Sequence, residues 1–217
     1  RWYRGLVDVY KRQLVRGFFM PDYFDQQPEG NAMTIGILVL AAGFSRRFGI
    51  DKRATRLAHG GTLLETSLQN ARASQLPVIV CLHPGDEALA EQLTSPGITP
   101  TICPDAGQGM GASLAWGVGQ ARHWSGALIA LGDMPEVSPA IFCKVASQTF
   151  PGNICQPTWK GQGGHPVGFG RQFFASLQAL TGDTGARSIL AANREFLVQL
   201  AVNDPGILHD VDRPEDL

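Results

Sequence analysis

The chain has 217 residues, a formal net charge of −1 and a hydrophobic content of 44%, which suit a single α/β domain with a buried core. A net charge this close to zero argues against broad nucleic-acid binding, which usually requires a basic face. No apolar run approaches the roughly 18 residues of a membrane span, so we expect no membrane partner. The four cysteines have no CxxC spacing, which favours reduced thiols and a cytoplasmic setting.

The first 32 residues differ from the rest of the chain. All three tyrosines fall there, and no sustained helical or alternating period of apolar residues is visible. Met33 stands directly before the first clear strand pattern. We therefore expect residues 1–32 to be a leader outside the fold, either non-native or disordered, and residues 33–217 to form one domain.

From residue 33 onward, strand and helix patterns alternate. The expected strands, in chain order, are 35–40, 78–82, 98–102, 127–131, 153–156, 166–169 and 196–202. The expected helices are 63–76, 87–93, 112–123, 139–148, 172–177 and 185–193, and we expect a terminal helix to start near Pro214. This alternation predicts a three-layer, Rossmann-like α/β fold with a mostly parallel sheet and helices on both faces.

Two segments follow strand ends, where open α/β sheets bind their ligands. The first, 41–52, is a loop in which Gly43 and Gly49 permit close backbone approach and Arg47 and Lys52 supply positive charge. Its spacing matches neither a Walker A motif nor a dinucleotide fingerprint. This pattern predicts a phosphate-binding loop of another kind, with a solvated basic surface loop as the alternative.

The second segment, Gly132-Asp-Met-Pro135, follows the expected strand 127–131 and contains Asp133. A lone aspartate at a strand end is often a helix cap. Opposite a phosphate-binding loop, however, a carboxylate is a suitable ligand for Mg²⁺, which binds one or two carboxylates together with substrate phosphates. We therefore predict that Asp133 binds Mg²⁺.

The segments 40–52 and Gly132-Asp-Met-Pro135 together resemble the MobA-like nucleotidyltransferase family, whose fold is of the glycosyltransferase-A type. Three later motifs resemble its molybdenum cofactor cytidylyltransferase (MocA-type) branch: Gly164-His-Pro-Val-Gly-Phe169, Gly182-Asp-Thr-Gly-Ala-Arg187 and the segment 209–216. The resemblance covers about residues 34–217. The chain departs from the pattern at Arg53-Ala-Thr-Arg56, which is more polar than the usual leucine-rich continuation.

The resemblance implies a reaction in which a terminal phosphate of an acceptor attacks the α-phosphorus of a nucleoside triphosphate and pyrophosphate leaves. It implies catalytic roles for Arg47, Lys52 and Asp133, and a metal site of Asp133 and Asp210. The nucleotide-binding residues that it implies are Leu40, Ala41, Ala42, Gly43, Ser45, Arg46, Gly49, Asp105, Gly109 and Ser113. The acceptor-binding residues that it implies are Gly164, His165, Pro166, Asp183, Arg187 and Asp212.

Alternatives stay open for several of these residues. Asp210 and Asp212 share one face of an extended segment, so either one is a candidate metal ligand, and Asp212 is also a plausible helix cap. His165 has an alternative interpretation as a structural loop residue. Arg187 suits an acceptor phosphate, but it suits an ion pair with Asp183 equally well.

The resemblance also implies the substrates. Guanylyl-transferring members typically carry Leu-Ala-Gly-Gly where this chain has Leu-Ala-Ala-Gly, so Ala42 favours CTP over GTP. The implied acceptor is a molybdopterin-type cofactor, and a molybdoenzyme or its chaperone is a further expected partner. Two other functions remain under consideration, namely a nucleotidyltransferase for a sugar or polyol phosphate and a non-catalytic nucleotide-binding module.

Overall fold

The computed structural model describes residues 33–43, 52–57 and 60–211. The chain divides after Met33 into two units, and the second, Thr34–Leu217, contains every helix and strand described below. The leader expected at residues 1–32 and the terminal helix expected near Pro214 lie outside the described residues. No helix in the described ranges is long and apolar enough to cross a membrane.

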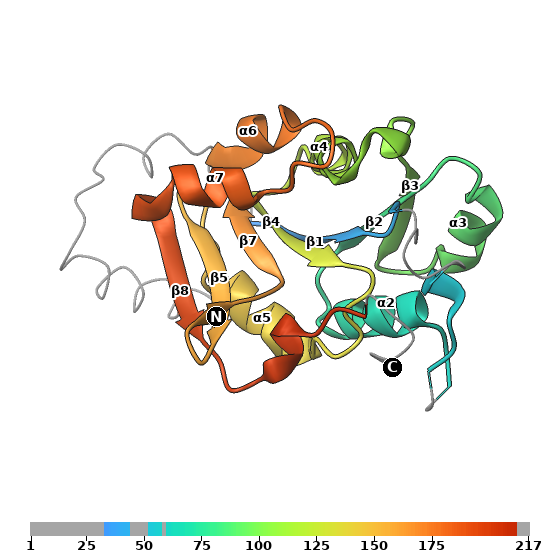
Figure 1. The fold of residues 1–217 in the computed structure, drawn as a ribbon, viewed down its shortest axis with the longest axis horizontal. Helices are drawn as coiled ribbons and strands as arrows, with labels where there is room; N and C mark the ends of the chain where they lie inside the picture. Colours follow the sequence, from blue (N-terminus) through green and yellow to red (C-terminus); the bar gives the residue numbers. More distant parts are fainter. Residues whose placement is uncertain (1–32, 44–51, 58–59, 212–217) are drawn as a thin grey trace, which may run out of the picture. The chain divides into compact units, whose positions relative to one another are not determined.

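Four parallel strands form the first half of the sheet, in the order β3-β2-β1-β4 (Figure 1). They are β1 (Ile35–Leu40), β2 (Val78–Leu82), β3 (Ile98–Ile102) and β4 (Gly126–Leu131). Every residue of β2 is buried, as expected for a strand that is covered on both faces. Pro100 is accommodated in β3 because this strand lies at the edge of the sheet.

The second half of the sheet is mixed. It consists of β5 (Ile154–Trp159), β6 (Gln162–Gly163), β7 (Val167–Gly170) and β8 (Leu197–Ala201). Strand β7 runs antiparallel to β4 and to β5, whereas β8 runs parallel to β5. The start of β7 therefore lies at the edge of the sheet where β4 ends, because Val167 pairs with Ile129.

Helices cover both faces of the sheet, as Figure 1 shows. Helices α2 (Leu63–Ala73) and α5 (Pro139–Ser147) lie on one face, and α4 (Met110–Gln120), α6 (Phe174–Gln178) and α7 (Arg187–Ala192) lie on the other. Helix α3 (Glu87–Leu93) packs beside β3. Short 3-10 turns occur at η1 (Lys52–Ala54), η2 (Ala106–Gln108), η3 (Arg171–Phe173), η4 (Arg194–Phe196) and η5 (Pro205–Leu208).

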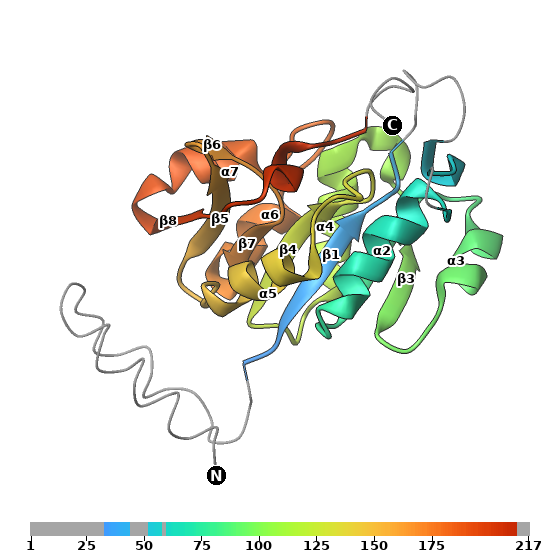
Figure 2. The ribbon, with the colours of Figure 1, turned by 90° about the horizontal axis from the view of Figure 1, so that it is seen from below.

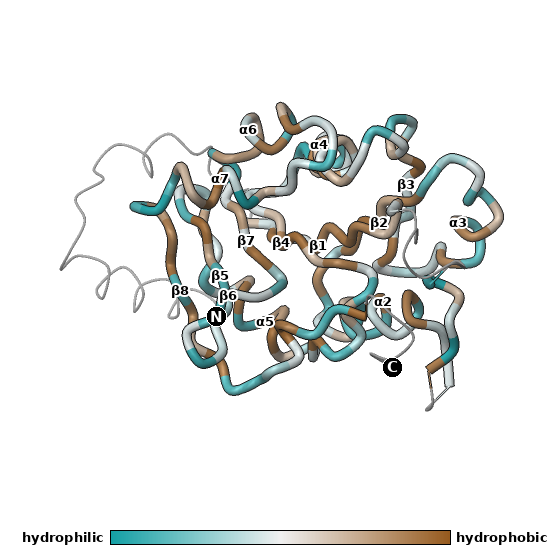
Figure 3. The backbone as a smooth tube through the Cα atoms, viewed as in Figure 1, coloured by the Kyte–Doolittle hydropathy of each residue, from teal (hydrophilic) through white to brown (hydrophobic). Residues whose placement is uncertain are grey.

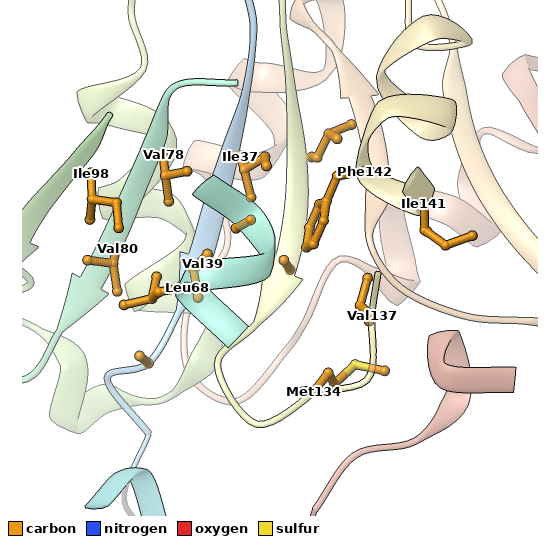
Figure 4. Close-up of a cluster of buried hydrophobic side chains, with 14 of the residues drawn as sticks. Ile37, Val39, Leu68, Val78, Val80, Ile98, Met134, Val137, Ile141 and Phe142 are labelled. Atoms are coloured by element: carbon orange, nitrogen blue, oxygen red, sulfur yellow. The ribbon is translucent and has the colours of Figure 1, made fainter. Parts of the chain in front are cut away.

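The core consists of two apolar layers separated by the sheet. Along β1, Ile37 and Val39 belong to the layer beneath α2 and α5, and Leu38 belongs to the layer beneath α4. Figure 3 shows the hydrophobic colour concentrated along the central strands, and Figure 4 shows part of the first layer. The period-two alternation of side chains along β1 thus supplies both layers at once.

The predicted fold class, a mostly parallel three-layer α/β fold, is confirmed. The strands predicted at 35–40, 78–82 and 98–102 and the helix at 87–93 match the structure in full. Helix α2 ends at Ala73, before the predicted 76, because Gln75 adopts a left-handed φ of 64°. Strand β6 was not predicted, because it is only two residues long and lies in a glycine-rich turn.

Candidate functional site

The site forms where β1 and β4 end side by side. Leu40 pairs with Leu131, and the Gly132 amide donates to the Leu40 carbonyl over 2.9 Å. A Cβ atom on Gly132 would lie 3.1 Å from the Cβ of Ala41, so the two strand ends approach closely. The two segments that the sequence places at strand ends, the loop after β1 and Gly132–Pro135, therefore start as neighbours at one edge of the sheet.

Lys52 and Asp133 form an ion pair at this edge. The Lys52 Nζ atom lies 2.5 Å from Asp133 Oδ2 and donates a second hydrogen bond to the Val211 carbonyl over 3.2 Å. The two side chains are only 17% and 21% exposed. The positive end of the first segment and the carboxylate of the second thus meet across 81 residues of sequence.

One oxygen of the Asp133 carboxylate has no hydrogen-bond partner in the described part of the chain. This atom, Oδ1, is also buried. The turn around it is fixed, because the Asn70 side chain donates to the Pro135 carbonyl and the Val211 amide donates to the Asp133 carbonyl. A buried oxygen without a donor is costly unless a ligand satisfies it, and it is well suited to a cation.

The segment 204–211 crosses the same edge of the sheet (Figure 2). Asp204 caps η5 through the Gly206 amide and also accepts a hydrogen bond from the Ser138 hydroxyl. The His165 amide donates to the Ile207 carbonyl over 2.9 Å. A Cβ atom on Gly164 would collide with that carbonyl, so only glycine allows this approach.

His165 lies half-buried among charged side chains. Burial lowers the pKa of His165, and the nearby Arg187 acts in the same direction. The Ile129 carbonyl, 3.4 Å from Nδ1, and the carboxylates of Asp133 and Asp210 oppose this shift without cancelling it, so the pKa stays below its usual range. The imidazole is therefore neutral at neutral pH, and it can both donate and accept a hydrogen bond.

The geometry also joins the predicted nucleotide and acceptor loops. The Gly111 amide donates to the Gly182 carbonyl over 2.7 Å, and a Cβ on Gly109, where φ is 123°, would collide with Asp183 and Gly182. Ala42 packs with Cys103 and Ala106 in a small buried cluster. The segment after β1 therefore contacts the segment 103–111, which carries the predicted nucleotide-binding residues Asp105 and Gly109. That segment in turn contacts residues 182–183, which include the predicted acceptor-binding residue Asp183.

This packing leads to a test on α4. In Gly111→Ala, the new Cβ would lie 2.7 to 2.9 Å from the carbonyl oxygens of residues 181, 182 and 184, so we expect a loss of about 1–3 kcal/mol in the free energy of unfolding. Gly119→Ala is the matched control in the same helix, where the nearest atom is 3.9 Å away. It should gain about 0.5–1 kcal/mol. Chemical denaturation measures both variants, and equal stabilisation would contradict the close contact.

The positions of the other predicted site residues give less support to the roles that the sequence implies for them. Ser113 is buried in α4, where its hydroxyl lies 3.5 Å from the Gly109 carbonyl, so the structure offers no exposed hydroxyl there. Asp105 is exposed and accepts a hydrogen bond from the Gln108 side chain. Within the described part of the chain, Arg187 is exposed and forms no ion pair with Asp183. Five predicted residues lie outside the described ranges: Ser45, Arg46, Arg47, Gly49 and Asp212.

Sequence reasoning missed one pair in this region. Arg53 binds Asp86 through two hydrogen bonds of 2.5 and 3.0 Å and also donates to the Ala41 carbonyl over 3.1 Å. Both side chains are 16% exposed. Arg53 thereby ties the start of the loop after β1 to the turn before α3. The polar departure at 53–56 was the only signal in the sequence, and nothing in it pointed to Asp86.

The donor set fits a cation that is completed by substrate oxygens. Across residues 33–43, 52–57 and 60–211, no group of three or more His, Cys, Asp and Glu side chains could hold a metal ion by itself. Asp133 and Asp210 are nevertheless close enough to the same imidazole to influence its pKa. One or two carboxylates with phosphate oxygens is the usual arrangement for Mg²⁺.

Comparison with known proteins identifies the family and agrees with the fold. The model of the MobA-like NTP transferase domain family matches residues 37–196. The crystal structure of Rv0371c from Mycobacterium tuberculosis H37Rv is similar to this chain, with 29% sequence identity and a TM-score of 0.75. The aligned region covers 86% of this chain and 96% of the Rv0371c chain. A complex of Rv0371c with manganese is 26% identical, covers 85% of this chain and 96% of its own, and has a TM-score of 0.70.

One curated relative is similar to a smaller part of the chain. The probable molybdenum cofactor guanylyltransferase of Chloroflexus aggregans is 30% identical over 130 residues, which are 58% of this chain and 59% of that protein. The match therefore spans less than two thirds of the relative's length.

Proposed function

Since this chain belongs to the MobA-like NTP transferase domain family, we propose that it transfers CMP from CTP to the terminal phosphate of a molybdopterin-type cofactor. The observation that carries this proposal is the pair of Lys52 and Asp133 at the ends of β1 and β4, with Asp133 Oδ1 buried and without a donor. A cation and a string of phosphates would satisfy both residues.

In the proposed reaction, an oxygen of the acceptor phosphate forms a bond to the α-phosphorus of CTP. The bond from the α-phosphorus to the bridging oxygen breaks, and the electron pair leaves with pyrophosphate. The chain has little covalent chemistry to do, because alignment and charge neutralisation supply most of the catalysis. We propose that Lys52 and Arg47 stabilise the negative charge that develops on the leaving pyrophosphate.

Asp133, together with Asp210, is assigned to the divalent cation, which we propose to be Mg²⁺. When bound, the cation would neutralise charge on the phosphate oxygens. The buried Oδ1 of Asp133 supports this assignment. The manganese complex of Rv0371c is a property of that protein, but it is consistent with a divalent cation in this family.

The acceptor side is assigned to the Gly164–Pro166 turn together with Asp183, Arg187 and Asp212. A neutral His165 can hydrogen-bond to an uncharged ring without adding charge to the site. The exposed guanidinium of Arg187, near enough to influence the pKa of His165, suits an acceptor phosphate. The hydrogen bond from the Gly111 amide to the Gly182 carbonyl supports an acceptor side that adjoins the proposed nucleotide-binding residues.

The choice of CTP rests on Ala42, which is buried against Cys103 and Ala106. The curated relative is named for guanylyl transfer, so the base needs a direct test. Pyrophosphate release should be measured with each of the four nucleoside triphosphates, with and without molybdenum cofactor. We expect release with CTP to exceed release with GTP and to require the cofactor. A preference for GTP would overturn the base assignment, and release that requires a sugar or polyol phosphate would overturn the acceptor.

The setting and partners of this activity belong to the same proposal. None of the four cysteines, which all lie in the described ranges, forms a disulfide, which supports a reducing, cytoplasmic setting. A molybdoenzyme or its chaperone is the proposed recipient of the product, because a nucleotide-extended cofactor must pass to a protein that uses it.

A further inference from the structure

Lys52 forms an ion pair with Asp133, the residue proposed above as a ligand of the divalent cation. Its ammonium is 2.5 Å from Asp133 Oδ2 and 3.2 Å from the Val211 carbonyl. The Val211 amide in turn donates to the Asp133 carbonyl over 3.0 Å, which fixes this part of the chain beside the ion pair. The ammonium is therefore held at the carboxylate by groups of the protein itself.

The position of the Lys52 ammonium beside Asp133 determines the local charge at the proposed cation site. The ammonium already neutralises the Asp133 carboxylate, and the two side chains are 17% and 21% exposed, so water screens them only partly. A divalent cation on the buried Oδ1 would stand next to the ammonium on Oδ2, and the like charges would repel. The carboxylate alone is thus a poor site for a free cation.

A nucleoside triphosphate would change this balance. Its phosphate oxygens supply further ligands to a divalent cation, and they offer the ammonium of Lys52 a second anionic partner. Both effects relieve the repulsion at Asp133.

We propose that Lys52 makes cation binding at Asp133 conditional on the nucleotide, so that the cation is retained only together with the triphosphate. The proposal rests on the metal role assigned to Asp133 under the proposed function. By linkage, the cation and the nucleotide each raise the affinity of the chain for the other by the same factor. That factor depends on the positive charge of residue 52.

Binding of Mn²⁺ to the full chain tests this directly, with free Mn²⁺ measured by electron paramagnetic resonance and no acceptor present. Titrations are run with Mn²⁺ alone and with Mn²⁺ plus CTP. Lys52→Met should bind Mn²⁺ alone about tenfold or more tightly than the unchanged chain, and CTP should strengthen its binding less. Lys52→Arg keeps the charge and should behave like the unchanged chain.

Two further variants separate the possible failures. Lys144→Met removes an exposed lysine from the last turn of α5 and should leave Mn²⁺ binding unchanged. Asp133→Asn should abolish binding at the site. If Asp133→Asn abolishes binding but Lys52→Met binds Mn²⁺ no more tightly, the role of Lys52 is overturned and the metal site stands. If Asp133→Asn has no effect, the metal assignment fails and the proposal fails with it.

Circular dichroism identifies any variant that does not fold. In that case Lys52→Gln replaces Lys52→Met, because it is also neutral but keeps hydrogen-bond donors that can reach Asp133. The expected tightening of Mn²⁺ binding is the same. Equal tightening in Lys144→Met would show a general effect of net charge and would overturn the proposal.

Discussion

Asp133→Asn is expected to lower turnover by on the order of 10³-fold while the chain stays folded. The amide has almost the same shape as the carboxylate, and the hydrogen bond from the Val211 amide to the backbone of residue 133 is kept. The change removes the negative charge that pairs with Lys52 and that we assign to the cation. Steady-state pyrophosphate release measures the loss, and circular dichroism checks the fold.

The matched control for this change is Glu91→Gln, an equivalent loss of charge on the exposed surface of α3. Its turnover should equal that of the unchanged chain. Near-normal turnover in Asp133→Asn would remove Asp133 from the catalytic machinery. It would also leave the buried Oδ1 atom without a functional explanation.

Lys52→Ala is expected to slow nucleotidyl transfer by on the order of 10²-fold. The ammonium is the described positive charge nearest to Asp133, and its loss leaves the charge on the departing pyrophosphate less stabilised. The effect should appear in the turnover number rather than only in the KM for the nucleotide, since the charge on the leaving group grows in the transition state. Rapid-quench measurement of a single turnover isolates the chemical step from product release.

Lys144→Ala is the control for Lys52→Ala, and Lys52→Arg should keep a part of the rate because the charge is retained. A single-turnover rate for Lys52→Ala equal to that of the unchanged chain would mean that Lys52 only positions substrate. Slower transfer with tighter Mn²⁺ binding in neutral variants of Lys52 is the combined pattern that we expect. A variant that merely unfolded the site would weaken both.

The sequence was a good guide wherever a pattern is local. The continuous apolar run of β1 and the helical spacing of α3 predicted their bounds. The loop after β1 and Asp133 were placed at one edge of the sheet by the rule for parallel strands, and the register of Leu40 with Leu131 agrees. Local patterns and chain order were therefore sufficient for the fold class and for placing these two strand ends at one edge of the sheet.

What the sequence could not predict depends on contacts between distant segments. The antiparallel direction of β7 brings the Gly164–Pro166 turn to the edge where β4 ends, and no local pattern encodes that direction. In the sequence Arg53 was only part of the polar departure at 53–56, and its partner Asp86 lies 33 residues away. The ion pair of Lys52 and Asp133 depends in the same way on how two strand ends meet.

The most direct test of the proposed reaction follows the position of a label in CTP. The chain is incubated with molybdenum cofactor and Mg²⁺, using CTP labelled either at the α-phosphate or at the γ-phosphate. Nucleotidyl transfer predicts that the α-label moves to the cofactor and that the γ-label is released in pyrophosphate. Transfer of the γ-label to the cofactor, or no movement of the α-label, would contradict a nucleotidyltransferase that acts on this acceptor.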